Sequence, residues 1–384
     1  MLEAELVTAV ERLDALASEW DALADACALP QMSPAWVLAW WRHVAPERAV
    51  PRTVVVRDGD ALVGLAPFYA EPGAGGRVDY RLPGIEIAGR LAPLALADRE
   101  WEVAEAVART LAGATPRPDA LRFEGTPLDA HWLTALRAEW PGALRPPLRL
   151  TQVEGNPLMS LEEGSFDAWL AGRSSNFRGQ MRRLRRRFAE AGGVSRLATS
   201  ATLGADTAAL TRLHAMRWDG KGHSNLVDLS DRFTAFVVEL GERLLASGRF
   251  ALRILELDGE PICAQLFVAA GGTFLFVNGG WDERHASLRP SLVCLLDAVE
   301  DVFERGAQRF DLGLGVQSYK LRFADGNAPL TWAVLMVPGA RLPITAARTA
   351  PALSRARLRD GARRLLSEER VEQLRGARWL RGRS

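Results

Sequence analysis

Two short polar segments contain the residue types best suited to bind a phosphate and to move a proton. The first, Asp282–Ser291, follows an apolar run at 273–279 and contains Arg284 and Arg289. Pro290 suits the first position of a helix, and a helix that starts just after a strand points free N–H groups at an anion. The sequence therefore predicts an anion site here. An ordinary strand–helix connection with solvated arginines explains the same residues equally well.

The second segment is Gly313–Lys320, which follows a predicted strand at 308–312. Open α/β sheets bind ligands at the carboxyl ends of their strands, which is where this segment would lie. Tyr319 is a candidate proton donor to a leaving group, and Lys320 a candidate to hold an anion or orient a carbonyl. The alternative is a surface turn whose tyrosine packs on a neighbouring helix.

His214 is the candidate base, on a predicted helix at 206–218. It shares a helical face with Leu210, so a histidine satisfied within the core is the competing interpretation. The loop 220–225 after this helix is a candidate lid. The remaining histidines are scattered without the spacing of metal ligands, so no metal is expected.

Two matching segments indicate how these residues are positioned. Runs 54–70 and 253–269 each read as strand, Asp-Gly turn and strand, which is a strong hairpin signal. Each hairpin is followed by a helix, at 100–111 and at 290–305, and then by another strand. Further helices are expected before each hairpin, at 10–24, 34–43, 166–171, 176–191, 206–218 and 231–247. The pattern predicts an α/β fold made of tandem units, each a central mixed sheet flanked by helices.

The Pro-rich stretch 141–157 marks the boundary between the two units. We expect domains at 1–150 and 151–340, followed by a basic helical tail at 341–384. The tail holds 12 arginines against four acidic residues. A helix packed on the body or fraying in solvent is the simplest interpretation, and peripheral contact with an anionic membrane or partner is the alternative.

Another basic segment, 173–187, contains seven arginines and no acidic residue. A solvated helix face would account for it. The more specific hypothesis is a recognition surface for a nucleotide phosphate, an acidic substrate or an RNA backbone. Aromatic residues do not interleave on the polar face, which weakens the RNA hypothesis.

Composition narrows the functional classes. The 384 residues have a net charge of +1, so nothing draws the whole chain toward DNA or a membrane. Three cysteines among apolar neighbours look like small buried residues of a reducing compartment. The first residues lack a signal-like apolar core, and no run is long enough to span a membrane. A cytoplasmic protein is expected.

These features together resemble the Gcn5-related N-acetyltransferase (GNAT) superfamily. The chain is most similar to its BioF2-like or CelD-like acetyltransferase branch, which is related to the FemABX peptidyltransferases. The resemblance spans about residues 1–338. The motifs that carry it are Arg178-x-x-Met181-Arg182-Arg183-Leu184, the Asp258-Gly259 turn, Leu288-Arg289-Pro290-Ser291-Leu292, Phe310-Asp311-Leu312-Gly313 with Tyr319-Lys320, and, in the first half, Gln31-x-Ser33-Pro34-x-Trp36.

The resemblance implies a donor site for acetyl-CoA or another acyl-CoA and no metal. Arg289, Ser291 and Leu292, with Arg284 nearby, would hold the pyrophosphate, and Val277-Asn278 would lie beside the thioester. The family commonly has glycine where this chain has Ser291, whose Cβ would crowd the phosphate. The first half lacks an equivalent phosphate turn and is expected to be a degenerate copy that shapes the substrate cleft.

The leading hypothesis is therefore an acyl-CoA-dependent N-acyltransferase acting on an amine of a small molecule, a sugar or an envelope precursor by direct attack. Tyr319 would protonate the thiolate, His214 or a relayed water would accept the amine proton, and Lys320 would bind substrate or CoA. An aminoacyl-tRNA-dependent, FemABX-like transferase is the second hypothesis. A non-catalytic scaffold in exopolysaccharide or envelope biosynthesis is the third.

Overall fold

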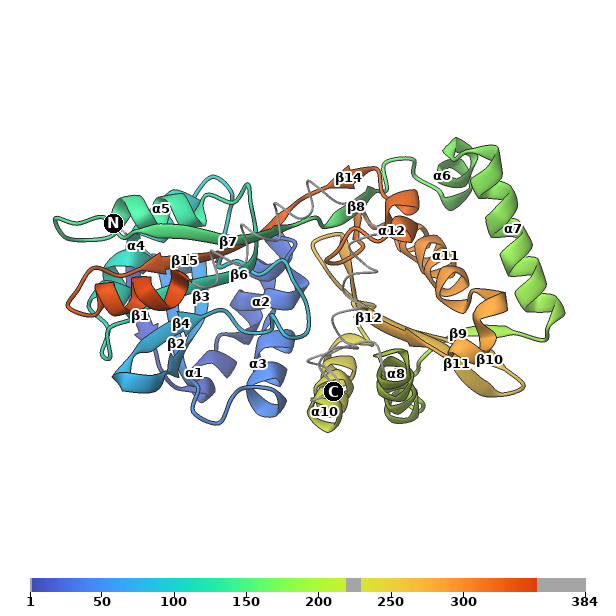
Figure 1. The fold of residues 1–384 in the computed structure, drawn as a ribbon, viewed down its shortest axis with the longest axis horizontal. Helices are drawn as coiled ribbons and strands as arrows, with labels where there is room; N and C mark the ends of the chain where they lie inside the picture. The colour runs from blue at the N-terminus through green and yellow to red at the C-terminus, as the bar shows by residue number, and fades with distance from the viewer. Residues whose placement is uncertain (1, 219–228, 351–384) are drawn as a thin grey trace, which may run out of the picture.

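The chain folds into two lobes, each built around one β-sheet, and Figure 1 shows them side by side in this computed structural model. Residues 2–218 and 229–350 are described. The expected lid at 220–225 and most of the expected basic tail lie outside the described residues. Within the described part of the tail, residues 342–350 are helical.

The first sheet is antiparallel except for one parallel pair between β4 and β6. Its strands, in spatial order, are β1 (Glu3–Val7), β2 (Val50–Asp58), β3 (Ala61–Pro72), β4 (Val78–Arg81), β6 (Ala120–Pro127), β15 (Leu330–Met336) and β7 (Leu148–Glu154), with β5 (Leu94–Ala95) on β3. The helices of this lobe are α1 (Val10–Asp14), α2 (Ala17–Ala26), α3 (Pro34–His43), α4 (Glu100–Ala112) and α5 (Trp132–Glu139), with short turns η1 (Pro30–Met32) and η2 (Ala74–Gly76).

The second sheet also contains one parallel pair, between β12 and β13. Its spatial order is β14 (Gly326–Asn327), β8 (Pro157–Ser160), β13 (Arg309–Asp311), β12 (Thr273–Trp281), β11 (Glu260–Ala270), β10 (Phe250–Leu257) and β9 (Val194–Leu197). Its helices are α6 (Phe166–Gly172), α7 (Ser175–Glu190), α8 (Leu203–Trp218), α10 (Ser230–Leu244), α11 (Pro290–Glu304) and α12 (Ser318–Phe323), with η3 (Glu283–Leu288) before α11.

Side chains alternate along the strands of the second sheet, and both of its faces are apolar. Phe267, Phe274 and Phe310 point to one face, where they form a core with α6, α7, α11 and α12. Leu266 and Leu275 point to the other face and join α8, α10 and the first lobe in a second core. The two lobes therefore share one continuous hydrophobic core rather than meeting through a flexible linker.

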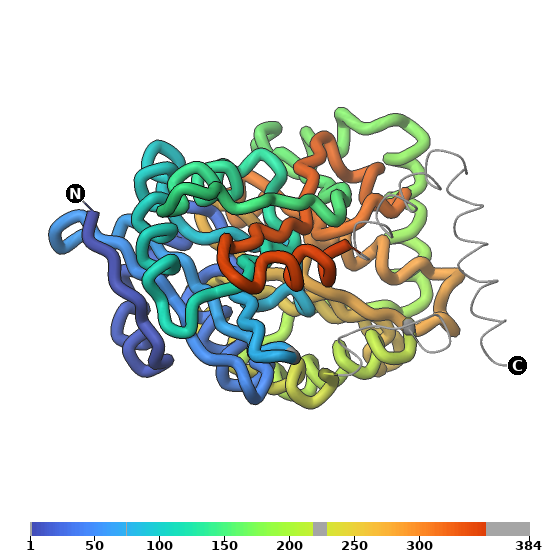
Figure 2. Tube along the Cα trace, turned by 60° about the vertical axis from the view of Figure 1, so that its left-hand side comes forward, coloured from blue at the N-terminus to red at the C-terminus, as the bar shows by residue number. Residues whose placement is uncertain are grey.

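Specific contacts fix this junction. Trp36 of α3 meets Phe236 of α10 edge to face, with ring centroids 5.0 Å apart. Asp21 accepts two hydrogen bonds from Arg249 across the lobes. Figure 1 and Figure 2 both show the blue helices of the first lobe beside the yellow-green helices of the second lobe. A junction of this kind holds the lobes in a defined relative position.

The chain crosses between the lobes twice. β7 and β15 both pair within the first sheet, although β15 follows the whole second lobe in the sequence. The expected division into 1–150 and 151–340 places 330–336 in the second unit, whereas its strand pairs in the first sheet. Backbone pairing with β6 places β15 in the first sheet. The local sequence pattern does not reveal which strand β15 pairs with.

The predicted α/β fold is confirmed, including both Asp-Gly hairpins and the helices at 100–111 and 290–305. In the second hairpin both Asp258 and Gly259 have positive φ, as a primed turn requires. The expected helix at 10–24 is broken into α1 and α2. None of the described helices is both long and apolar enough to cross a membrane.

Candidate active site in the second lobe

β12 is interrupted by a bulge at Val277. Its pairing with β11 passes from Phe267–Phe276 to Leu266–Asn278, so Val277 has no partner in that ladder. On its other side, the parallel pairing with β13 ends at Leu275–Asp311. Val277 therefore lies outside both ladders, at the point where β12 separates from β13.

A glycine pair after the bulge lets α8 approach the strand closely. A Cβ on Gly280 would lie 2.2 Å from the backbone nitrogen of His214, so no other residue fits without a shift of α8. His214 is buried, and its Nδ1 lies 3.3 Å from the carbonyl oxygen of Gly279. Burial lowers the pKa of His214, which keeps the ring neutral at pH 7, while Gly279 and Asn278 act in the opposite direction.

Lys320 sits where β12 and β13 separate. Gly313, with φ of +75°, turns the chain away from β13, and a Cβ there would lie 2.9 Å from the carbonyl oxygen of Phe276. Lys320 Nζ donates to the carbonyl oxygens of Gly313 at 3.2 Å and Leu314 at 2.9 Å. Burial lowers the pKa of Lys320 to about 8, against an opposing effect of Asp311. The lysine thus holds the loop that leads to α12.

Tyr319 precedes Lys320 on α12, a short helix where the sequence predicted only a polar turn. Burial raises the pKa of Tyr319 to about 12, and Arg217 opposes this shift. Arg217 in turn lies over the ring of Trp281 at 5.4 Å and binds Glu283 at 2.8 Å. Tyr319 therefore stays protonated at neutral pH.

The turn that the sequence predicted to bind phosphate connects η3 to α11, and its groups are not equally available. Arg289 occupies the residue before α11 with φ of +49°, and its exposed side chain makes no ion pair with the described residues. Arg284 is bound to Asp282 by contacts of 2.6 and 2.9 Å, which lowers the pKa of that carboxyl group. An anion would therefore meet Arg289 first, and Arg284 only after it leaves Asp282.

Ser291 and Leu292 occupy the first turn of α11. The Ser291 hydroxyl and carbonyl oxygens both accept hydrogen bonds from Gln265 Nε2, at 3.2 and 3.0 Å. The Ser291 side chain thus points to the sheet. The N–H of Leu292 already donates to the carbonyl of Arg289 at 3.0 Å. A phosphate held by Leu292 would have to displace that bond, which weakens the predicted role of Leu292.

A buried polar cluster that the sequence did not reveal lies beside Lys320. Asp311, fully buried at the end of β13, accepts hydrogen bonds from Asn156 at 3.0 Å and from the N–H of Gly313 at 2.8 Å. Its other oxygen lies 3.8 Å from Nε of Arg90, a first-lobe residue with φ of +65°. Burial raises the pKa of Asp311, and Arg90 opposes the shift. The cluster ties the first lobe to the loop that carries Tyr319.

The structure thus gathers most of the predicted residues around the last part of β12. His214 and Asn278 lie on the side of the first lobe. Lys320 lies where β12 and β13 separate, and Tyr319 packs against the core of the second lobe. The signal for the missed Asp311 was present in the sequence, as a carboxylate ending an otherwise apolar strand. Its partner Arg90 lies 221 positions earlier in a loop without periodicity, so that pairing was not predictable.

Comparison with known proteins identifies this arrangement. Residues 175–321, from α7 to α12, match the family described as Acetyltransferase (GNAT) domain. The structure of FemX has 11% identity and a TM-score of 0.58, with 87% of this chain and 97% of that chain covered. A conserved protein of unknown function from Bacteroides thetaiotaomicron VPI-5482 has 11% identity and a TM-score of 0.52, with coverage of 88% and 100%. No curated protein matches this chain in sequence.

The family match points to acyltransferase chemistry in the second lobe. That match covers residues 175–321, and the chain is similar in fold to FemX over 87% of its length.

Proposed function

We propose that the protein transfers an acyl group, in the simplest case acetyl, from acyl-CoA to an amine of a small molecule, a sugar or an envelope precursor. The observation that carries this proposal is the bulge at Val277, which leaves a backbone N–H outside both strand ladders. That N–H would donate to the thioester carbonyl oxygen and stabilise the negative charge that develops there.

The reaction is a direct displacement. The amine nitrogen attacks the thioester carbonyl carbon, a C–N bond forms, and the C–S bond breaks. The amine proton passes to His214, directly or through water, because the lowered pKa keeps this imidazole neutral. Tyr319 gives its proton to the leaving thiolate and regains it from solvent. No protein side chain is acylated.

Binding of the donor relies on the start of α11. The guanidinium of Arg289 and the N–H of Ser291 would hold the pyrophosphate, with the helix dipole adding to the attraction. The first lobe, fixed against β11 and β12, would close the acceptor side of the site. Acceptor selectivity would then come from first-lobe loops, including the one that carries Arg90.

Charge reversal at Arg289 tests the donor site. In Arg289→Glu we expect about a 10- to 100-fold weaker affinity for acetyl-CoA, since a charge-assisted contact is replaced by repulsion. Calorimetric titration measures it. Arg309→Glu, which makes the same charge change at the opposite, exposed end of β13, should leave the affinity unchanged. Absence of acetyl-CoA binding to the unaltered protein, or equal affinities in all three proteins, would refute the proposal.

An aminoacyl-tRNA donor is a second candidate, favoured by the arginine face of α7. Binding of tRNA that falls steeply with salt, together with no turnover of acetyl-CoA, would replace the first proposal by this one. Any turnover of acyl-CoA would exclude a purely structural scaffold.

A further inference from the structure

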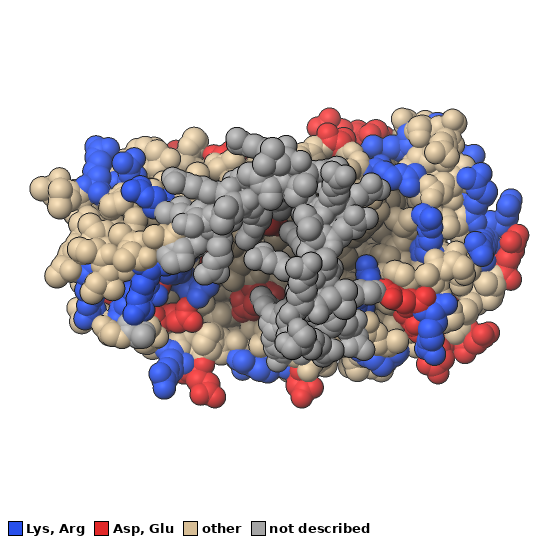
Figure 3. All heavy atoms as spheres, viewed as in Figure 1, with Lys and Arg blue, Asp and Glu red and all other residues tan. Residues whose placement is uncertain are grey.

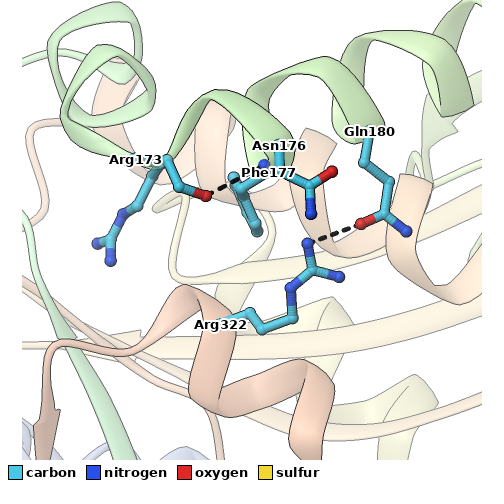
Figure 4. Close-up of a pocket in the computed structure, with 6 residues that line it drawn as sticks. Arg173, Asn176, Phe177, Gln180 and Arg322 are labelled. Atoms are coloured by element: carbon cyan, nitrogen blue, oxygen red, sulfur yellow. Dashed lines mark hydrogen bonds between the residues drawn. The ribbon is translucent and has the colours of Figure 1, made fainter.

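A cavity of about 330 Å³ lies between the start of α7 and α12, outside the site described above. It is lined by Arg173, Ser174, Asn176, Phe177, Gln180 and Arg322. Figure 4 shows that Asn176, Gln180 and Arg322 converge from the two helices, whereas the guanidinium of Arg173 points away from them. No carboxylate is among the lining residues.

Arg322 is held in place by two contacts. Its guanidinium lies over the ring of buried Phe177 at 5.0 Å, and its Nη2 donates to Oε1 of Gln180 at 2.7 Å. A guanidinium has five N–H groups, so most of them remain for a ligand. A positioned arginine of this kind loses little side-chain entropy when it binds an anion.

The carboxamides add further donors to the same space. The oxygen of Gln180 is taken by Arg322, so its amide N–H₂ group is the part left to face a ligand. Asn176 presents a second carboxamide beside it. The cavity is therefore rich in donors and poor in acceptors, which is the arrangement that a tetrahedral oxyanion requires.

Neighbouring charges reinforce this preference. A second cavity, of about 430 Å³, shares Gln180 with the first and is also lined by Arg183 and Arg187. Neither of these arginines forms an ion pair within residues 2–218 and 229–350, whereas Arg185 is bound to Asp297 and Glu300. The one acidic residue in the lining of the second cavity, Glu190, pairs with Arg186 at 3.5 Å. Figure 3 shows basic side chains along the edge of the molecule formed by α7. The resulting positive potential attracts anions to the first cavity.

We infer that this cavity binds a phosphate group of a small ligand through Arg322, Asn176 and Gln180. Arg322 follows Tyr319 by one turn of α12, so the two side chains leave the same face of this helix. The cavity volume exceeds that of a phosphate alone and leaves room for the sugar or nucleoside that bears it. The 3′-phosphate of the acyl-CoA donor and a phosphate on the acceptor share this chemistry. Phosphate binding in this cavity does not depend on the proposed function. The assignment of the phosphate to the donor or to the acceptor does.

An RNA strand is less suited to this surface. The aromatic residue of the cavity, Phe177, is buried beneath Arg322 and offers no free ring face on which a base could stack.

Inorganic pyrophosphate is the probe that tests the inference, observed by phosphorus NMR with the full-length protein carrying Arg289→Glu, which weakens the separate pyrophosphate site proposed at the start of α11. We expect Arg322→Gln to weaken pyrophosphate binding about 10- to 100-fold, as loss of a charge-assisted contact requires. Arg309→Gln is the control with the same charge change outside the cavity. The titrations are made on free protein, with saturating acetyl-CoA, and with acetyl-dephospho-CoA, which lacks the 3′-phosphate.

Each outcome decides a different question. Arg322-dependent binding that persists with acetyl-CoA assigns the cavity to a phosphorylated acceptor. Binding blocked by acetyl-CoA but not by its dephospho form assigns it to the donor. Pyrophosphate binding that Arg322→Gln leaves unchanged, or short RNA that binds α7 and resists displacement by pyrophosphate, overturns the inference. Failure of acetyl-CoA to bind the unaltered protein would refute the proposed function alone.

Discussion

Replacement of Tyr319 by phenylalanine is expected to lower kcat about 10²- to 10⁴-fold, the usual contribution of a positioned general acid. The phenylalanine keeps the ring that packs beside α11, so the fold and the KM for acetyl-CoA should change little. The leaving thiolate would then have to take its proton from water. Stopped-flow measurement of CoA release with a thiol reagent gives the rate.

The pH dependence distinguishes this role from a structural one. Burial raises the pKa of Tyr319 to about 12, so the phenol stays protonated and able to donate up to about pH 10. The deficit of Tyr319→Phe should therefore be nearly constant from about pH 6 to pH 10. Tyr69→Phe, a change of the same kind in the first lobe, should retain full activity. Wild-type kcat in Tyr319→Phe would remove Tyr319 from the mechanism.

Removal of the N–H of Val277, a residue outside both strand ladders, is the second change with a large expected effect. Val277→Pro deletes the donor proposed to bind the thioester oxygen, and a fall in kcat of about 10²- to 10³-fold is expected. Val277→Ala shortens the side chain but keeps the N–H, so its kcat should stay within a few-fold of wild type.

The pair of variants separates catalysis from folding. Proline is tolerated best where a strand residue has no ladder partner, as at this bulge, and melting curves of both variants check that the sheet is intact. Equal losses of kcat in the proline and alanine variants would show that the side chain, and not the backbone N–H, is what matters.

Much of the fold was predictable because patterns of neighbouring residues determine its helices and hairpins. The stripe of Leu292, Leu295, Leu296, Val299 and Phe303 repeats every three to four residues, and α11 has the predicted start and nearly the predicted end. The Asp258-Gly259 turn fixed the register of β10 and β11 through a conformation that few residue pairs adopt. Such elements are determined by a dozen neighbouring residues.

The site was only partly predictable, since its key contacts join distant segments. Val277 was singled out by resemblance, but the bulge depends on how β11 and β13 pair on either side of it. The ion pair between Asp311 and Arg90 joins the two lobes, so it cannot be predicted without knowing how the lobes pack. The same is true of the pairing of β15 with β6. Ser291 shows the same limit: its hydroxyl is directed to Gln265, a contact that the sequence around Pro290 does not disclose.

The central claim is that acyl-CoA binds at the end of β12 in the second lobe, and amide hydrogen exchange with and without acetyl-CoA tests it most directly. We expect saturating acetyl-CoA to slow exchange in peptides covering 276–292, while peptides from the β2–β3 hairpin of the first lobe remain unchanged. Protection confined to the first lobe, or none anywhere at saturation, would contradict the account.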